Sequence, residues 1–77
     1  MYTMTLREWL SEHTEVASVD YTYYAKDGNI EYNYVTREDI LRGSWDVPEG
    51  IAECEVIKAG TETIEENDVV GYVDVRA

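Results

Sequence analysis

The residues of this sequence that could do chemistry are few and isolated from one another. His13 is the only histidine, and it lies at the end of an expected helix, where the helix dipole favours a cation. Cys54 is the only cysteine, and its neighbours Glu53 and Glu55 raise the pKa of a thiol and suppress the reactive thiolate. No serine lies in a nucleophile-elbow sequence. We therefore expect structural roles for His13 and Cys54, no enzymatic activity and no cofactor.

One acidic cluster has ligand types that a cation accepts. Glu65, Glu66 and Asp68 lie together, and Asn67 adds an amide carbonyl. Calcium requires about six to eight oxygen ligands in a defined loop, and the Asp-x-Asp-x-Asp-Gly pattern of such loops is absent. The segment is typical of a solvated turn, and we expect no metal site there.

The length and composition indicate one small globular domain, residues 1–77. A hydrophobic content of 44% argues against disorder, although a chain this short has a small core. No apolar run approaches the roughly 20 residues of a membrane span, and no signal sequence follows the first methionine. A single cysteine excludes an internal disulfide and fits a reducing compartment. We expect a complete chain, located in the cytoplasm.

The charge is the unusual feature of the composition. Seventeen acidic residues and six basic residues give a net charge of −11. Such a field repels nucleic acid and anionic membranes and attracts basic surfaces, with association rates that fall as salt rises. The charge therefore predicts a protein partner with a basic surface, and neither direct nucleic-acid binding nor membrane binding.

A tyrosine-rich β-hairpin is predicted from Val16 to Thr36, with Asp27 and Gly28 as a two-residue type I′ turn. That turn places Ala25 opposite Ile30, Tyr23 opposite Tyr32, Tyr21 opposite Tyr34, and Val19 opposite Thr36. These four pairs share one apolar face, because side chains alternate along a strand. The other, more polar face carries Tyr24 opposite Glu31, Thr22 opposite Asn33, and Asp20 opposite Val35. This register separates apolar from polar residues.

A short helix is predicted before the hairpin, from Leu6 to His13. Thr5 is a good N-cap, and Glu8 completes a capping box. Leu6, Trp9 and Leu10 share one face at helical spacing, and we expect that face to pack on the apolar face of the hairpin.

The second half of the chain contains further predicted strands. Residues 36–43 fit either one helical turn or the start of a third strand over residues 39–45, and the strand is favoured. Pro48 to Glu53 suits a brief helical turn. Cys54 to Ile64 and Val69 to Arg76 read as two strands, with Gly71 allowing close approach of Trp9 or Trp45. The expected fold class is α+β, with a short N-terminal helix packed on an antiparallel sheet of four or five strands.

The order of these segments resembles a known group of proteins. The stretches TLREWL, ILRGSWDVPEGIAECEVI and VVGYVDV, with the hairpin and an acidic turn between them, resemble small acidic proteins of bacterial phages and mobile elements. That group includes anti-CRISPR and anti-restriction inhibitors. The resemblance implies a stoichiometric inhibitor of a host nucleic-acid-processing protein, and it identifies no site residue.

Two binding hypotheses follow from these observations. In the first, the protein mimics nucleic acid, with carboxylates in place of phosphates, and blocks a basic site. The acids expected to face solvent are its candidate contacts: Asp20, Glu31, Glu38, Asp39, Glu62, Glu65, Glu66 and Asp68. The alternative use of this acidic surface is simply solubility.

In the second hypothesis, the protein binds a partner through tyrosines without mimicry. Tyr24, expected on the outer face of the hairpin, and Tyr2, before the helix, are the candidate anchors, because tyrosine buries a large area with few rotatable bonds. A homodimer formed through an edge strand, the last strand of the sheet, is a variant of this hypothesis.

Overall fold

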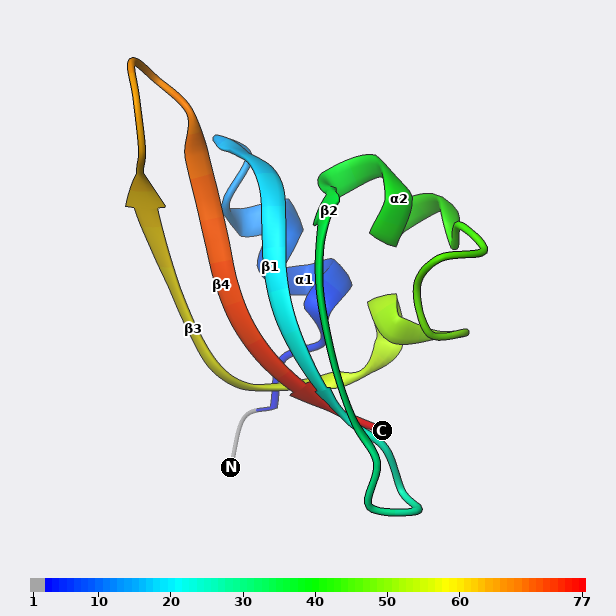
Figure 1. Cartoon of the computed structure of the whole chain (residues 1–77). Coiled ribbons are helices and arrows are strands. Elements are labelled where there is room, and N and C mark those ends of the chain that lie inside the picture. Colours follow the sequence, from blue (N-terminus) through cyan, green and yellow to red (C-terminus); the bar gives the residue numbers. More distant parts are fainter. Residues whose placement is uncertain (1–2) are drawn as a thin grey trace.

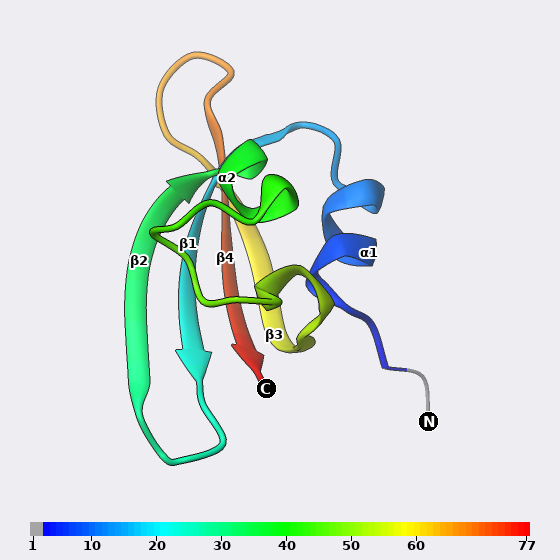
Figure 2. The same cartoon turned by 90° about the vertical axis from the view of Figure 1, so that its right-hand side faces the viewer.

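Two β-hairpins lie side by side in one four-stranded sheet, and all the helices lie on one of its faces (Figures 1 and 2). The computed structural model describes residues 3–77. The elements in chain order are α1 (Leu6–Glu12), β1 (Val16–Tyr24), β2 (Ile30–Thr36), α2 (Arg37–Arg42), the 3₁₀ helix η1 (Ile51–Glu53), β3 (Glu55–Thr63) and β4 (Val69–Arg76). The α+β fold class, the four strands and the packed N-terminal helix are confirmed. Tyr2 lies outside the described residues.

The sheet is mixed, whereas the sequence predicted a wholly antiparallel one. The strand order is β2-β1-β4-β3, and the two central strands, β1 and β4, run parallel to each other. The last strand is therefore paired on both sides, and its prediction as an edge for self-association is wrong. The edges of the sheet are β2 and β3.

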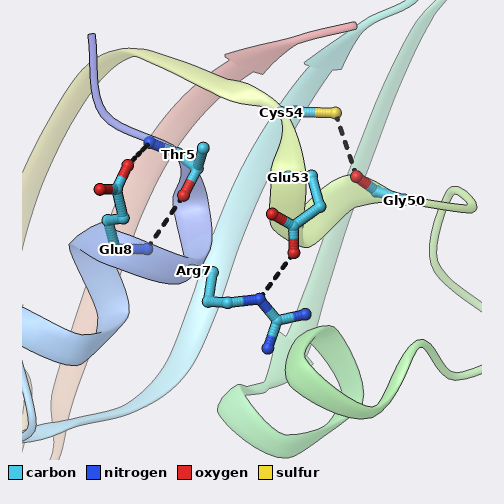
Figure 3. A network of polar contacts seen from close by, with 6 residues as sticks. All are labelled: Thr5, Arg7, Glu8, Gly50, Glu53 and Cys54. Atoms are coloured by element: carbon cyan, nitrogen blue, oxygen red, sulfur yellow. Dashed lines mark hydrogen bonds and ion pairs between the residues drawn. The ribbon is translucent and has the colours of Figure 1, made fainter.

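The capping box predicted at the start of α1 is confirmed. The Thr5 hydroxyl accepts a hydrogen bond from the Glu8 N–H at 3.1 Å, and the Glu8 carboxylate accepts one from the Thr5 N–H at 2.9 Å (Figure 3). The helix ends at Glu12, one residue before the predicted end. His13 is the C-cap, and its ring stacks on Trp9 with 4.2 Å between the ring centroids.

The contact between α1 and the sheet is closest at Gly71. A Cβ atom at this position would lie 2.8 Å from Cη2 of Trp9 and 3.2 Å from Cγ1 of Val16. The absence of a side chain at Gly71 therefore lets the indole ring lie directly on the backbone of β4. Of the two rings expected there, Trp9 is the one observed, whereas Trp45 lies in a loop and is 95% exposed.

Residues 37–42 form α2, so the prediction of a third strand here is wrong. The Thr36 hydroxyl accepts a hydrogen bond from the Asp39 N–H at 3.2 Å, and Gly43 ends the helix with a φ of 74°. These local signals outweigh the β-branched and aromatic content of the segment, because capping satisfies backbone groups that a lone strand would leave free. Ile40 is then buried in the core.

Arg37, the first residue of α2, joins the two helices. Its guanidinium donates hydrogen bonds to the carbonyl oxygens of His13 at 2.9 Å and of Val16 at 3.1 Å, and also to that of Leu10. These carbonyls lie at the C-terminal end of α1 and just beyond it, where a cation is favoured. Those of Leu10 and His13 also accept hydrogen bonds from the backbone N–H groups of His13 and Val16. One side chain thus ties α2 to the end of α1.

The hairpin is present, but its register differs from the predicted one by one residue. Ala25 pairs with Asn29 around a three-residue loop, and Gly28 has a φ of 93°. Asp27 does not have the positive φ that a type I′ turn requires. Its carboxylate instead accepts hydrogen bonds from the N–H and the side-chain amide of Asn29. This local Asx contact stabilises the longer loop.

The change in register reverses the faces of β2. Tyr21 now lies opposite Asn33, and Val19 lies opposite Val35. Tyr21 is buried as predicted, whereas the predicted core residues Tyr32 and Tyr34 point away from the helices and are 74% and 56% exposed. A shift by one residue moves every side chain of a strand to the other face, which explains the whole correction.

Most of the remaining helices and strands agree with those predicted from the sequence. Strands β3 and β4 confirm the two strands expected from Cys54 to Ile64 and from Val69 to Arg76. The helical turn expected from Pro48 to Glu53 is shorter than predicted, because η1 begins at Ile51, after Gly50 with a φ of 76°. Gly71, Val73 and Val75 are buried on the inner face of β4. Arg7 of α1 and Glu53 of η1 form an ion pair at 2.6 Å on the surface of this layer (Figure 3).

We expect Gly71→Ala to lower the free energy of unfolding by about 2 kcal/mol, because the added methyl group forces Trp9 out of its position. Urea denaturation followed by tryptophan fluorescence measures the change. Gly60→Ala is the matched control, since Gly60 lies in β3 and no atom lies within 4 Å of the place that its Cβ would take. This control should change stability by less than about 0.5 kcal/mol. Equal denaturation midpoints for the two variants would contradict this account of the Trp9 contact.

Candidate functional site

The face of the sheet opposite the helices is uncovered and carries most of the exposed aromatic side chains. Strand alternation and the pairing of the four strands arrange its residues in rows across the sheet. We call this surface the tyrosine face and define it by three of these rows, each named in the strand order β2, β1, β4, β3. The rows are Tyr34, Asp20, Tyr72 and Gly60; Tyr32, Thr22, Asp74 and Lys58; and Ile30, Tyr24, Arg76 and Glu55.

The large side chains of this face come from three strands. Tyr32, Tyr34 and Ile30 lie on β2, Tyr24 lies on β1, and Tyr72 lies on β4, and all five are exposed. The bare backbone at Gly60 leaves a depression of about 290 Å³ beside Tyr72 and Asp74. The face therefore offers aromatic rings on one side and a shallow hollow on the other.

Carboxylates lie between the rings of the tyrosine face. Asp20 is directly between Tyr34 and Tyr72, and Glu62, on β3, is next to Tyr72. Partial burial and the negative charge of Glu62 raise the pKa of the Tyr72 hydroxyl, with Asp20 adding to the effect. The Tyr72 hydroxyl is thus a neutral hydrogen-bond donor in an acidic environment.

The structure divides the predicted site residues among separate regions. Asp20 and Tyr24 lie on the tyrosine face, and Glu62 lies on the same side of the sheet next to Tyr72, as their predicted exposure requires. Glu31 pairs with Tyr23, so its side chain belongs to the opposite face, near the hairpin loop.

The remaining predicted acids lie away from the sheet faces. Glu38 and Asp39 are in the first turn of α2, where Asp39 pairs with Arg42 at 3.2 Å. Glu65, Glu66 and Asp68 line a depression at the β3–β4 turn, at the opposite end of the sheet from the β1–β2 loop (Figure 1). The predicted acids thus form no single surface.

The sequence reasoning missed Ile30, Tyr32, Tyr34 and Tyr72 as members of a binding surface. The first three were assigned to the core by the two-residue turn. The sequence Asp27-Gly28-Asn29 contained a signal for the three-residue loop. An aspartate whose carboxylate accepts a hydrogen bond from the backbone N–H two residues later favours this longer loop. With that loop, Val35 rather than Tyr34 faces the core.

Trp45 is a second exposed aromatic feature, located in the loop between α2 and η1. Two contacts hold this loop. Val47 is buried, and the side-chain amide of Asn33 donates a hydrogen bond to the Asp46 carbonyl oxygen at 3.2 Å. The loop is therefore anchored to edge strand β2 on the side of the sheet where the helices lie (Figure 2).

Neither residue considered for catalysis lies in a constellation of reactive groups. Nδ1 of His13 is 2.8 Å from the Trp9 carbonyl oxygen. The Cys54 thiol donates a hydrogen bond to the Gly50 carbonyl oxygen at 3.6 Å (Figure 3). In residues 3–77, no three His, Cys, Asp or Glu side chains are grouped so that they could hold a metal ion. No helix of the described chain is long and apolar enough to cross a membrane.

These features define the class of fold: an α+β domain with a mixed four-stranded sheet, helices on one face, and aromatic and acidic side chains on the other. Comparisons with protein-family models, with curated proteins and with solved structures find no match to this chain.

We expect the Cys54 thiol to react slowly with alkylating reagents near neutral pH. Burial, followed by the negative charge of Glu53, raises its pKa, so the reactive thiolate is scarce until the solution is strongly alkaline. Rates of iodoacetamide alkylation between pH 7 and about pH 10 measure this. The urea-unfolded chain is the control and should react several-fold faster at pH 8, whereas equal rates would contradict the burial effect.

Proposed function

We propose that this chain is a non-enzymatic binding protein that docks its tyrosine face onto a protein partner with arginine and lysine side chains on its surface. The observation that carries the proposal is the uncovered sheet face, on which five large apolar side chains are exposed together. Monomeric proteins rarely leave a large contiguous apolar surface without a binding role.

The chemistry of the side chains supports a protein as the occupant. Tyrosine combines a large apolar ring with a hydroxyl that can find a partner in an interface, and it loses little conformational entropy on binding. Tyr32 and Tyr34 are the most exposed rings of the face, and they lie on an edge strand where a partner can approach them.

The charge of the face supports a basic partner. Asp20, Asp74 and Glu62 lie among the rings, and the chain as a whole carries a charge of −11. An arginine can stack its guanidinium on a tyrosine ring while it donates hydrogen bonds to an adjacent carboxylate. Rings and carboxylates that alternate at the spacing of strands suit several such arginines.

A nucleic-acid-mimicking inhibitor is the more specific form of this function. The observation that favours it is the extension of acidic side chains from the open face of the sheet to the β3–β4 turn. Asp20, Asp74 and Glu62, continued by the carboxylates of the turn at the end of β3 and β4, can replace phosphates along a basic channel. In that case the partner is a nucleic-acid-processing protein, and its basic surface is its nucleic-acid site.

We expect the double variant Tyr32→Ala, Tyr34→Ala to lose most partner binding, because it removes the two most exposed rings of the face. The immobilised chain is used to retain proteins from a bacterial lysate, and the affinity of the purified retained protein is measured by calorimetry. The loss should be about tenfold or more. Ile64→Ala is the matched control, because it truncates an exposed apolar side chain outside the face. Retention of no basic protein, or unchanged affinity of the double variant, would refute the proposal.

Reversal of the turn charges separates mimicry from binding by the tyrosine face alone. Mimicry predicts that Glu65→Lys, Glu66→Lys and Asp68→Lys together weaken binding strongly, that the affinity falls steeply with salt, and that DNA or RNA competes. Binding by the rings alone predicts a small effect of the triple reversal and no competition by nucleic acid. Titrations of the same purified partner at several salt concentrations distinguish the two outcomes.

A further inference from the structure

Edge strand β3 has an open backbone edge of defined length. In the described chain, β3 pairs with β4 on one side only. On its other side, the segment before α1 covers the start of the edge: the Val56 N–H donates to the Met4 carbonyl oxygen at 2.8 Å, and the Leu6 N–H donates to the Cys54 carbonyl oxygen at 3.0 Å. No backbone group of residues 3–77 covers the outer side of residues 57–63, all of which are exposed, and the middle of this stretch is residue 60.

The direction of the free backbone groups follows from the neighbouring hydrogen bonds. The Ile64 N–H donates to the Asp68 carbonyl oxygen, on the side of β4. Backbone N–H and C=O groups alternate in direction from one residue to the next along an antiparallel strand. The N–H and C=O groups of Ala59, Thr61 and Thr63 therefore point away from β4. The irregularity at Ile57 shifts this alternation by one residue, which explains why the Val56 N–H also points outward.

We propose that a second copy of this chain pairs antiparallel with β3 about a two-fold axis at Gly60. In this register Lys58 lies opposite Glu62 of the second copy, and Ala59 lies opposite Thr61 of the second copy. The result is a continuous eight-stranded sheet. The inference does not depend on the proposed function, because it requires the backbone edge of β3 and shares only Lys58 and Gly60, at the rim, with the tyrosine face.

The charges of β3 indicate a second copy as the occupant. Lys58 and Glu62 are the only charged residues of the uncovered stretch, they have opposite signs, and they lie two positions on either side of Gly60. They pair with Asp74 and Val70 of β4, so both side chains are on the same face. The two-fold axis therefore forms two equivalent ion pairs, since each lysine meets the glutamate of the other copy.

Other registers lack this complementarity. A two-fold axis at Ala59 or at Thr61 also brings the outward N–H and C=O groups of the two copies together. However, the axis at Ala59 places Lys58 opposite Gly60 of the second copy, and the axis at Thr61 places Glu62 opposite it, so neither forms the ion pairs. The axis at Gly60 puts the two glycines opposite each other at a pair without direct hydrogen bonds, where the Cα atoms approach to about 4.5 Å. No atom lies within 4 Å of a Cβ position at Gly60, so this approach is unobstructed.

The net charge opposes this association and gives it a distinctive salt dependence. Two copies with a charge of −11 repel each other at long range. Salt screens this repulsion, so we expect dimerisation to strengthen as salt rises from low to physiological concentration. Binding of a basic partner to the tyrosine face should weaken over the same range. The two-fold axis also places both tyrosine faces on the same side of the joined sheet.

Disulfide trapping tests the register directly. In a Cys54→Ser background, Gly60→Cys places the two thiols opposite each other, and mild oxidation by diamide should give a covalent dimer. Thr63→Cys is the matched control, because it is on the same exposed edge but faces Ile57 of the second copy. Circular dichroism confirms that both variants fold. Equal trapping of both variants, or no trapping of Gly60→Cys, would overturn the inference.

Charge exchange tests the ion pairs by analytical ultracentrifugation. Lys58→Glu should weaken dimerisation about tenfold, and so should Glu62→Lys, because each replaces two attractions by two repulsions. The double exchange should restore the dimer. Lys26→Glu, in the β1–β2 loop, has the same charge change away from the edge and should lower affinity less than Lys58→Glu. A chain that remains monomeric up to millimolar concentration, as expected if β3 instead accepts a peptide of another protein, would refute the proposal.

Discussion

The packing of the Trp9 ring on the bare backbone of Gly71 is the contact on which the two layers of this protein depend. Helix α1 has about two turns, too few to be stable alone, so its place is determined by what its apolar side contacts. Arg37 adds the second constraint, because it binds carbonyl groups at the end of α1 from the first residue of α2. Together these contacts hold both helices on one face of the sheet.

This one-sided arrangement explains the exposed aromatic surface. The connection from β2 to β3 runs from one edge of the sheet to the other across the face that α1 already covers (Figure 2). Within residues 3–77, no further helix or strand lies on the opposite face. Tyrosine suits such a position, because its ring shields the sheet while its hydroxyl remains in contact with water. The open edge of β3 borders the open face, but the large side chains of that face lie on the other three strands, so the proposed basic partner and the proposed second copy need not compete.

The hairpin shows how a small local difference changes a predicted site. With Asp27 and Gly28 at the centre of a two-residue turn, the predicted hairpin has one apolar face and one polar face. The observed loop has one more residue, which brings Val35 to the core and sends Tyr32 and Tyr34 to solvent. Asp20, Tyr24 and Glu62 nevertheless face solvent on the open side of the sheet, as expected. The acids of α2 and of the β3–β4 turn lie elsewhere, because their positions depend on how the second half of the chain returns to the sheet.

The sequence alone determined the features that depend on neighbouring residues. The capping box of Thr5 and Glu8, the limits of β4, those of β3 to within one residue, and a helical turn that ends at Glu53 are of this kind, because each depends on side chains within a few positions of one another. The helix at residues 37–42 and the face of each tyrosine on β2 also depend on local hydrogen bonds, those of Thr36 and Asp27, but these compete with strand and turn preferences of similar size. Only the tertiary structure decided the parallel pairing of β1 with β4 and the contact of Arg37 with the end of α1, because both join segments that are distant in the sequence.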